Sequence, residues 1–102
     1  MKLVLKDKEL DLKDCHTFKD KLLGFMFKKN INYALRFKCK SIHTFFMKEN
    51  IDVIITDKNN KVLYIYSNLP SNKIIIKKDA YYFYELPKHT NTYSVNDKLV
   101  IK

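Results

Sequence analysis

The chain has 102 residues, a mass of 12.2 kDa and a formal net charge of +9, and 46% of its residues are hydrophobic. This length predicts one domain over residues 1–102, and no apolar run approaches the roughly 20 residues that a membrane span needs. One Gly and two Pro exclude collagen-like repeats, Gly-rich phosphate loops and flexible low-complexity linkers.

The N-terminal part predicts a β-hairpin or two short strands, followed by one short helix. Residues 3–5 and 10–12 are apolar segments separated by a polar turn. Thr17 can cap a helix with Asp20 at its third position, and Gly24 stands where such a helix would end. The apolar segment 3–5 is too short for the core of an export signal, which predicts a cytoplasmic protein.

From Tyr33 onward the apolar pattern changes to period two, which is typical of strands. Residues 57–60 (DKNN) tolerate a left-handed backbone and predict the clearest hairpin turn of the chain. About seven or more short strands with one short N-terminal helix predict a mainly β fold, a single jelly-roll-like sandwich or a squat barrel. The predicted strands cover residues 42–47, 51–56, 61–66, 73–77, 80–86 and 98–102.

The charges are unevenly distributed along the chain. Seven basic residues and no acidic residue lie from Lys21 to Lys48, whereas five carboxylates lie from Asp7 to Asp20. Clustered cations attract polyanions at long range. However, only one of the 20 basic residues is Arg, so the bidentate donors that read phosphates and bases are nearly missing. The excess of Lys, Ile, Asn and Tyr is also typical of AT-rich coding sequences.

Strand alternation places Arg36, Lys38 and Lys40 on one face, where they form a candidate basic face that could follow a phosphate backbone. The aromatic residues 81–84 could stack on bases, although aromatic residues that alternate along a strand more often belong to a core. Specific nucleic-acid binding is therefore not favoured, and weak Lys-based binding stays an alternative.

Five segments together resemble one known family. Residues 41–48 (SIHTFFMK) run into residues 51–57 (IDVIITD), and the pieces GFMF (24–27), YELP (84–87) and ND (96–97) occur in the matching order. This arrangement, over about residues 15–102, resembles the family called domain of unknown function 192. The resemblance implies a mainly β, jelly-roll-like domain of unassigned biochemical role. The chain departs from the family pattern at Asn50, Lys88 and Asn96, where Pro, Gly and Gly are usual.

His43, Lys48, Asp52 and Glu85 are the candidate ligand-binding residues that the resemblance carries over. Asp52 lies within an apolar strand, and Glu85 shares a predicted strand face with aromatic residues. A carboxylate in such surroundings either has a partner or destabilises the fold through the free energy of burying a charge. One interpretation gathers the two carboxylates and Lys48 in a cleft, for acid–base chemistry or polar ligands. The other is structural, with Lys48 paired to Asp52 and Glu85 facing solvent or capping backbone groups.

No metal or cofactor is predicted. Cys39, His43 and Met47 are spaced by four residues, which in a strand separates neighbours by about 13 Å, too far for one metal ion or a Cys–His hydrogen bond. Cys15 and Cys39 are predicted to be reduced thiols.

The sequence therefore predicts a non-catalytic binding or interaction module for a small polar ligand or a protein partner, as a monomer or a weak oligomer without membrane contact. A small hydrolase that uses paired carboxylates in a cleft is the alternative, because the absence of catalytic motifs does not exclude catalysis.

Overall fold

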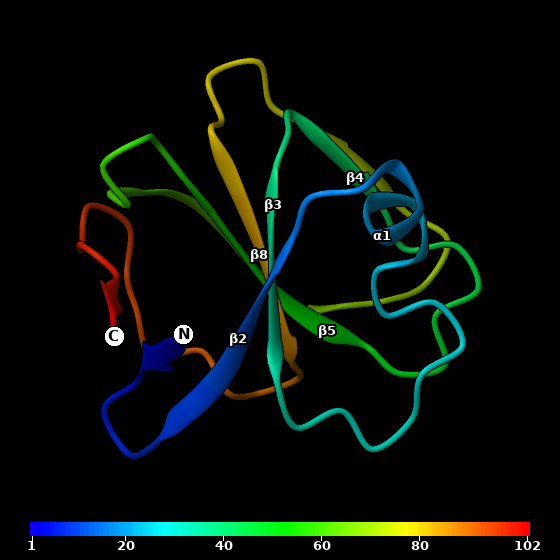
Figure 1. Cartoon of the computed structure of the whole chain (residues 1–102), viewed down its shortest axis with the longest axis horizontal. Helices are drawn as coiled ribbons and strands as arrows, with labels where there is room; N and C mark the ends of the chain where they lie inside the picture. Colours follow the sequence, from blue (N-terminus) through cyan, green and yellow to red (C-terminus); the bar gives the residue numbers. More distant parts are fainter.

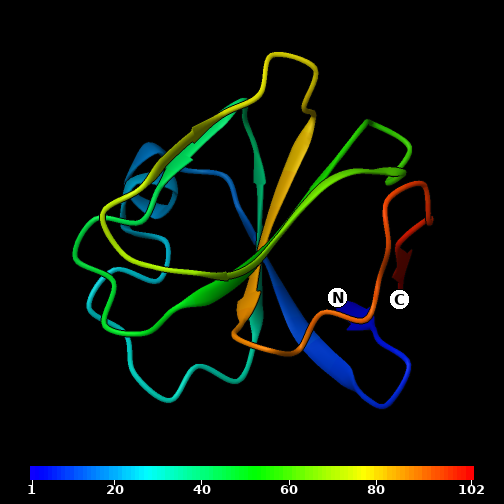
Figure 2. The same ribbon diagram turned by 180° about the vertical axis from the view of Figure 1, so that it is seen from behind.

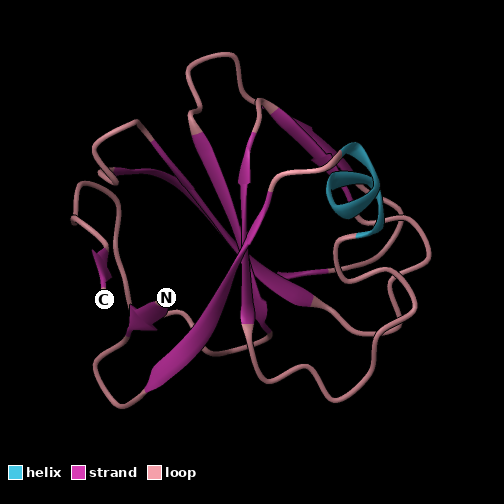
Figure 3. Cartoon of the chain, viewed as in Figure 1, coloured by secondary structure: helices cyan, strands magenta, loops and turns pink.

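A computed structural model describes the backbone of residues 1–102 and every side chain except that of Phe18. The chain is mainly β with one short helix, as the sequence predicts (Figure 3). Among the described residues, no helix is long and apolar enough to cross a bilayer. The elements are β1 (Lys2–Val4), β2 (Glu9–Cys15), α1 (Phe18–Leu23), β3 (Ala34–Lys38), β4 (Ser41–His43), β5 (Ile51–Thr56), β6 (Val62–Leu69), β7 (Ile74–Ile76), β8 (Tyr82–Pro87) and β9 (Val100–Ile101).

One curled sheet contains seven strands in the order β6-β5-β8-β3-β2-β1-β9, and β4 and β7 form a separate two-stranded sheet (Figure 1). β2 and β3 run parallel, which the crossover through α1 allows, and the other pairs are antiparallel. The pairs β5–β6, β4–β7 and β3–β8 are nested in sequence, as in a long hairpin that has been rolled up. The predicted fold class is thus confirmed, whereas the finer jelly-roll connectivity stays a prediction.

β5 lies at the centre of the fold, and all six of its residues are buried. Its side chains enter two hydrophobic clusters in alternation. Ile54 belongs to the cluster of Tyr84 and Leu86, and Ile55 belongs to the cluster of Phe83. A strand that is covered on both faces needs apolar residues in succession, which explains why this segment reads as an apolar run with one carboxylate.

The N-terminal hairpin and the short helix form where the sequence predicts them. Leu3 of β1 lies opposite Leu10 of β2. The Thr17 hydroxyl accepts a hydrogen bond from the N–H of Asp20 at 3.0 Å and so caps α1. The helix ends at Gly24, whose φ of +47° lies in the region that favours glycine. Both ribbon views place α1 beside β4 (Figures 1 and 2).

The predicted strand that begins at residue 42 is wrong beyond His43, because the chain turns there. The Thr44 hydroxyl donates to the carbonyl of Pro70 at 2.8 Å and accepts from the N–H of Lys73 at 2.9 Å. Such side-chain bonds to the backbone compete with strand pairing. Thr44 is therefore fixed against the loop between β6 and β7, and the aromatic residues after it form a turn.

Candidate functional site

Asp52 is a buried carboxylate that holds loop backbone in place. It is 2% exposed on β5. Its Oδ1 accepts from the N–H of Asn68 at 2.9 Å, and its Oδ2 accepts from the N–H groups of Thr90 and Asn91, each at 3.0 Å. Three such donors satisfy the carboxylate without a cation. Lys48 is exposed and forms no ion pair with a described residue, so the predicted Lys48–Asp52 pair does not form.

Glu85 is as buried as Asp52 but has far fewer hydrogen bonds. It is 2% exposed on β8, and its Oε1 has no hydrogen-bond partner among the described residues. Burial raises the pKa of Glu85 to about 8, although the N–H of Phe25 acts in the opposite direction. A Cβ at Gly24 would lie 3.1 Å from Oε1, so this carboxyl is sealed directly beneath the turn that ends α1.

The two carboxylates lie on opposite faces of the sheet. In the β5–β8 pair, Val53 is opposite Glu85 and Asp52 is opposite Leu86. Paired residues share a face and successive residues alternate, so Asp52 points to the face of Leu86 and Glu85 to the other face. A hydrolytic site with two carboxylates needs both groups beside one bond. Asp52 and Glu85 do not provide that arrangement.

His43 connects the end of β4 to the end of α1. Its Nδ1 accepts from the N–H of Phe45 at 3.1 Å, and its Nε2 lies 3.1 Å from the carbonyl oxygen of Leu22. Because a carbonyl accepts, these bonds assign the proton to Nε2 and occupy both ring nitrogens. The ring also stacks on Phe45, with centroids 5.1 Å apart. His43 thus positions the turn that follows β4.

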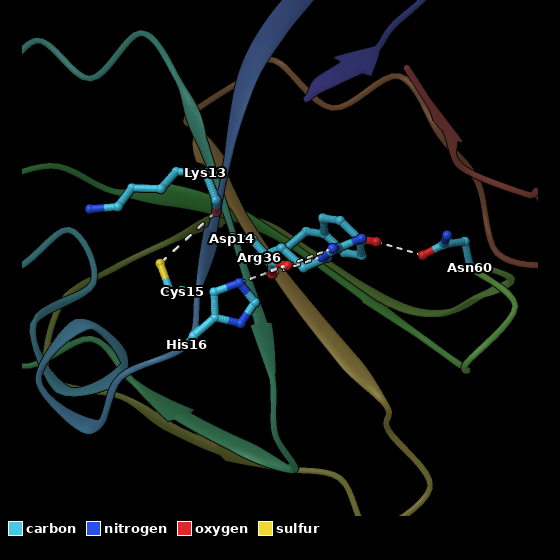
Figure 4. A network of polar contacts seen from close by, with 7 residues as sticks. Lys13, Asp14, Cys15, His16, Arg36 and Asn60 are labelled. Carbon is cyan, nitrogen blue, oxygen red and sulfur yellow. Dashed lines mark hydrogen bonds and ion pairs between the residues drawn. The ribbon is translucent and has the colours of Figure 1, made fainter.

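Arg36 and Lys38 of the predicted basic face have partners within the chain. The Nε and Nη2 atoms of Arg36 donate to the two carboxylate oxygens of Asp14 at 3.0 and 2.7 Å (Figure 4). This hydrogen bonding lowers the pKa of Asp14. The guanidinium lies 4.7 Å from the ring centroid of Tyr82, and the Lys38 Nζ lies 4.9 Å from that of Tyr81.

Lys40 lies just beyond β3 and is also engaged. Its Nζ donates to the carbonyls of Lys78 and Ala80, each at 2.9 Å. A phosphate backbone on this face would therefore compete with existing contacts of all three cations. The role of this face in nucleic-acid binding stays a prediction.

The cysteines have the properties of inert thiols. Cys15 and Cys39 are both free. Burial raises the pKa of both thiols, to about 11 for Cys15, and the thiolate is the form that attacks electrophiles or binds metals. No cluster of three or more His, Cys, Asp or Glu is placed to hold a metal ion among the residues described.

An apolar pocket of about 430 Å³ lies between α1 and β4. This volume is within the range of roughly 300 to 1,000 Å³ that is usual for ligand pockets. Of the four predicted ligand-binding residues, His43 lines this pocket, and Lys48, Asp52 and Glu85 do not. The pocket is lined by Lys21, Leu22, Phe37, Cys39, Ser41, Ile42, His43, Phe45 and Ile74.

Large apolar side chains around this pocket are exposed. Leu22 is 48% exposed and Ile74 is 61% exposed, and Phe46, next to the pocket residue Phe45, is 64% exposed. Single exposed apolar residues are ordinary, but a group of them around a pocket is typical of an interaction site. The sequence did not reveal this site, because the same aromatic and β-branched residues are also the signal for a core strand.

Phe27 and Phe46 are exposed aromatic residues that join two turns. Their φ angles are +64° and +60°, which is uncommon for bulky residues. The rings stack with centroids 5.6 Å apart, and the N–H of Phe27 donates to the carbonyl of Phe46 at 3.1 Å. Strained backbone of this kind persists where the surroundings hold it and is frequent at binding sites. The aromatic pair extends the apolar surface from Phe45 toward the turn after α1.

The fold and the pocket define a small, mainly β domain with an apolar surface site. The family model DUF192, described as Uncharacterized ACR, matches residues 1–96. The chain belongs to this family of uncharacterised proteins, as its sequence motifs indicate. The match includes the N-terminal hairpin, which lies outside the resemblance over residues 15–102.

Two curated relatives carry the name UPF0127 protein. One, from Thermococcus sibiricus, is 35% identical over 83 residues, a match that covers 74% of this chain and 54% of the relative. The other, from Pyrococcus horikoshii, is 38% identical over 87 residues and covers 78% of this chain and 75% of the relative. This chain thus spans about half the length of the first relative and three quarters of the second.

Solved structures of distant sequence share the fold. A protein of Sinorhizobium meliloti 1021, provisionally described as a transcription regulator, superimposes with a TM-score of 0.82 at 15% identity, over 97% of this chain and 89% of its own. A protein of unknown function from Novosphingobium aromaticivorans superimposes with a TM-score of 0.82 at 11% identity, over 98% of this chain and 82% of its own. At these identities the likeness shows the fold alone.

Proposed function

We propose that the protein is a non-catalytic binding module that receives a bulky apolar side chain of an acidic protein partner in the pocket between α1 and β4. The observation that carries this proposal is the apolar pocket of about 430 Å³ with exposed Leu22, Phe45 and Ile74 at its border. Burial of one large apolar side chain contributes about 1.5 to 3 kcal/mol, enough to anchor a partner.

The chemistry of the walls favours a protein partner over a small polar ligand. His43 and Ser41 are the polar uncharged side chains of the wall apart from the thiol, and both His43 ring nitrogens already have partners. Lys21 is the cation in the wall, and the chain carries a net charge of +9. A partner whose apolar anchor is flanked by carboxylates complements both features.

The other sequence-based alternatives have less support. The hydrolase alternative relied on Asp52 and Glu85 in one cleft, and these residues lie on opposite faces of the sheet.

The free thiols support the cytoplasmic location that the sequence predicts, because cysteines stay reduced in that compartment.

Anilinonaphthalene sulfonate provides a direct test, because it combines an apolar ring system with one anionic group. We expect saturable binding to the folded protein, measured by fluorescence. Leu22→Gln should weaken this binding about tenfold, since it removes apolar area from the pocket border and leaves a residue that suits a helix.

Leu23→Gln is the matched control. Leu23 is the next residue of α1, is 40% exposed and does not line this pocket. Its substitution should leave the affinity within about twofold of the parent, because a surface change away from the site has a small effect. Equal weakening by both substitutions, or the absence of saturable binding, would contradict the proposed pocket.

A further inference from the structure

β7 has one unpaired edge. In the two-stranded sheet, β7 pairs with β4, and no other described strand pairs with it. The N–H of Lys77 donates to the carbonyl of Lys40 at 2.8 Å. Hydrogen bonding alternates along an antiparallel pair, so the N–H and C=O groups of Ile74 and Ile76 point away from β4. This edge therefore presents backbone donors and acceptors in the geometry of a strand.

The side chains on this edge are apolar and exposed. Ile74 and Ile76 are 61% and 64% exposed, whereas Ile75 between them is 7% exposed and packs into the core. An exposed edge of this kind is a template for an additional strand, and charged residues at its ends limit nonspecific pairing. Lys73 and Lys77 flank β7. The Lys77 Nζ lies 4.5 Å from the ring centroid of Tyr64 and 5.9 Å from that of Tyr66, so a carboxylate at this end would share the ammonium with these aromatic rings.

A second copy of the chain does not suit this edge when the two β7 strands overlap fully. Antiparallel pairing of two β7 strands about Ile75 would place Lys73 of each copy opposite Lys77 of the other. Like charges directly opposite each other destabilise a strand pair, and both copies carry a net charge of +9. A partner strand with carboxylates at its ends would instead face a Lys at each end.

We propose that β7 accepts an extended acidic segment of a protein partner as a third strand of the β4–β7 sheet. The backbone of the segment bonds to Ile74 and Ile76, its apolar residues cover these side chains, and its terminal carboxylates face Lys73 and Lys77. Main-chain bonds then supply the affinity, and the apolar and acidic positions supply the specificity. This proposal goes beyond the pocket, because it assigns a backbone-pairing role to the unpaired edge of β7, although the side chain of Ile74 also lines the pocket.

The test uses a labelled synthetic peptide in which Val and Thr alternate between Glu residues at both ends. We expect it to bind the full chain in fluorescence anisotropy, and to bind more weakly as salt increases. Methylation of the peptide amides that face β7 should weaken binding about tenfold, since it removes backbone donors and leaves the protein unchanged. A peptide with Lys ends should not bind.

Ile76→Pro tests the same backbone pairing from the side of the protein. It removes an N–H that points away from β4, so it leaves the β4–β7 pairing intact, and proline is tolerated on strand edges. Binding should fall about tenfold in this variant but remain in the matched control Ile76→Thr, which keeps the N–H. If Ile76→Pro does not melt cooperatively, the comparison of methylated and unmethylated peptides decides alone.

The outcomes separate this proposal from the proposed pocket. Equal affinity of the methylated and unmethylated peptides, or no binding at low salt, overturns strand addition. Binding that is lost in Leu22→Gln but kept in Ile76→Pro assigns the peptide to the pocket and also overturns it. Concentration-dependent dimerisation that Ile76→Pro abolishes would assign the edge to a second copy, against the proposal. Binding that Ile76→Pro and amide methylation weaken, and that Leu22→Gln leaves unchanged, supports it.

Discussion

The surroundings of Asp52 and Glu85 differ although the two residues lie on adjacent strands and are equally buried. Asp52 accepts three backbone hydrogen bonds from loops far away in the sequence. Glu85 has an oxygen without a hydrogen-bond partner in the described structure, and its pKa is raised to about 8. Burial alone therefore does not determine the charge of a carboxyl group. The number of donors that reach it decides whether the ionised form is stable.

This difference assigns the two residues different roles. Asp52 connects β5 to the loops around it through three backbone hydrogen bonds. Glu85 fills space beneath the turn at Gly24 and favours its protonated form near neutral pH. Three substitutions test the comparison, starting with the one for which the largest effect is expected.

Asp52→Ala should destabilise the fold by about 5 kcal/mol, because it leaves three backbone N–H groups without their charged acceptor. The measurement is urea unfolding followed by circular dichroism. The control is Asp97→Ala, which removes an exposed carboxylate that accepts from the N–H of Ser94 at 2.8 Å. This control should cost about 1 kcal/mol, and equal costs would contradict the role given to Asp52.

Glu85 should make the stability of the protein depend on pH between about 4.5 and 8. Below the ordinary pKa of 4.5, both the folded and the unfolded chain hold the proton. As the pH rises, the unfolded chain loses this proton first, so the free energy of unfolding falls until the folded pKa of about 8 is passed. The raised pKa corresponds to a loss on the order of 5 kcal/mol.

Glu85→Gln isolates this effect, since an amide of the same shape does not titrate. The difference in unfolding free energy between the parent and Glu85→Gln should change with pH across this window and stay constant below it. Urea unfolding at a series of pH values measures the difference. A difference that does not vary with pH would mean that Glu85 ionises normally in the folded protein.

Gly24→Ala should cost about 2 kcal/mol in unfolding free energy, from the φ of +47° and from a Cβ placed 3.1 Å from the Glu85 Oε1. Asn30→Ala is the control for backbone strain alone, because Asn30 has a φ of +54° and is exposed. It should cost about 1 kcal/mol. Thermal melting of both variants checks the order, and a smaller effect at Gly24 would show that the turn is not closed over Glu85.

The sequence predicted local structure well where one short segment contains all the residues that specify it. Thr17, Asp20 and Gly24 specify both ends of α1. The alternation within one strand is also visible in the sequence. The register between β5 and β8 is not, because it depends on the packing of both strands. The sequence could therefore identify Asp52 and Glu85 as unusual residues but could not place them on opposite faces.

The pocket was harder to predict, because its apolar residues resemble those of a core. The aromatic residues after His43 leave the strand because Thr44 bonds to the loop before β7, a contact between distant segments. Ile74 and Ile76 are of the same residue type as buried strand residues, and they are exposed because they point to the outer face of the small sheet, whereas Ile75 points to the core. Hydrophobic periodicity predicts that a strand forms, but not what covers it.

The nested strand pairs have a consequence for how the chain reaches this fold. The β5–β6 hairpin needs only a short turn to close. Once it has formed, it brings β4 near β7, and that pair in turn brings β3 near β8. Each step then closes a small loop instead of a long one, which reduces the entropy lost at that step. We expect the rolled hairpin to assemble from its centre outward, with β9 joining last, because its pairing with β1 connects the two ends of the chain.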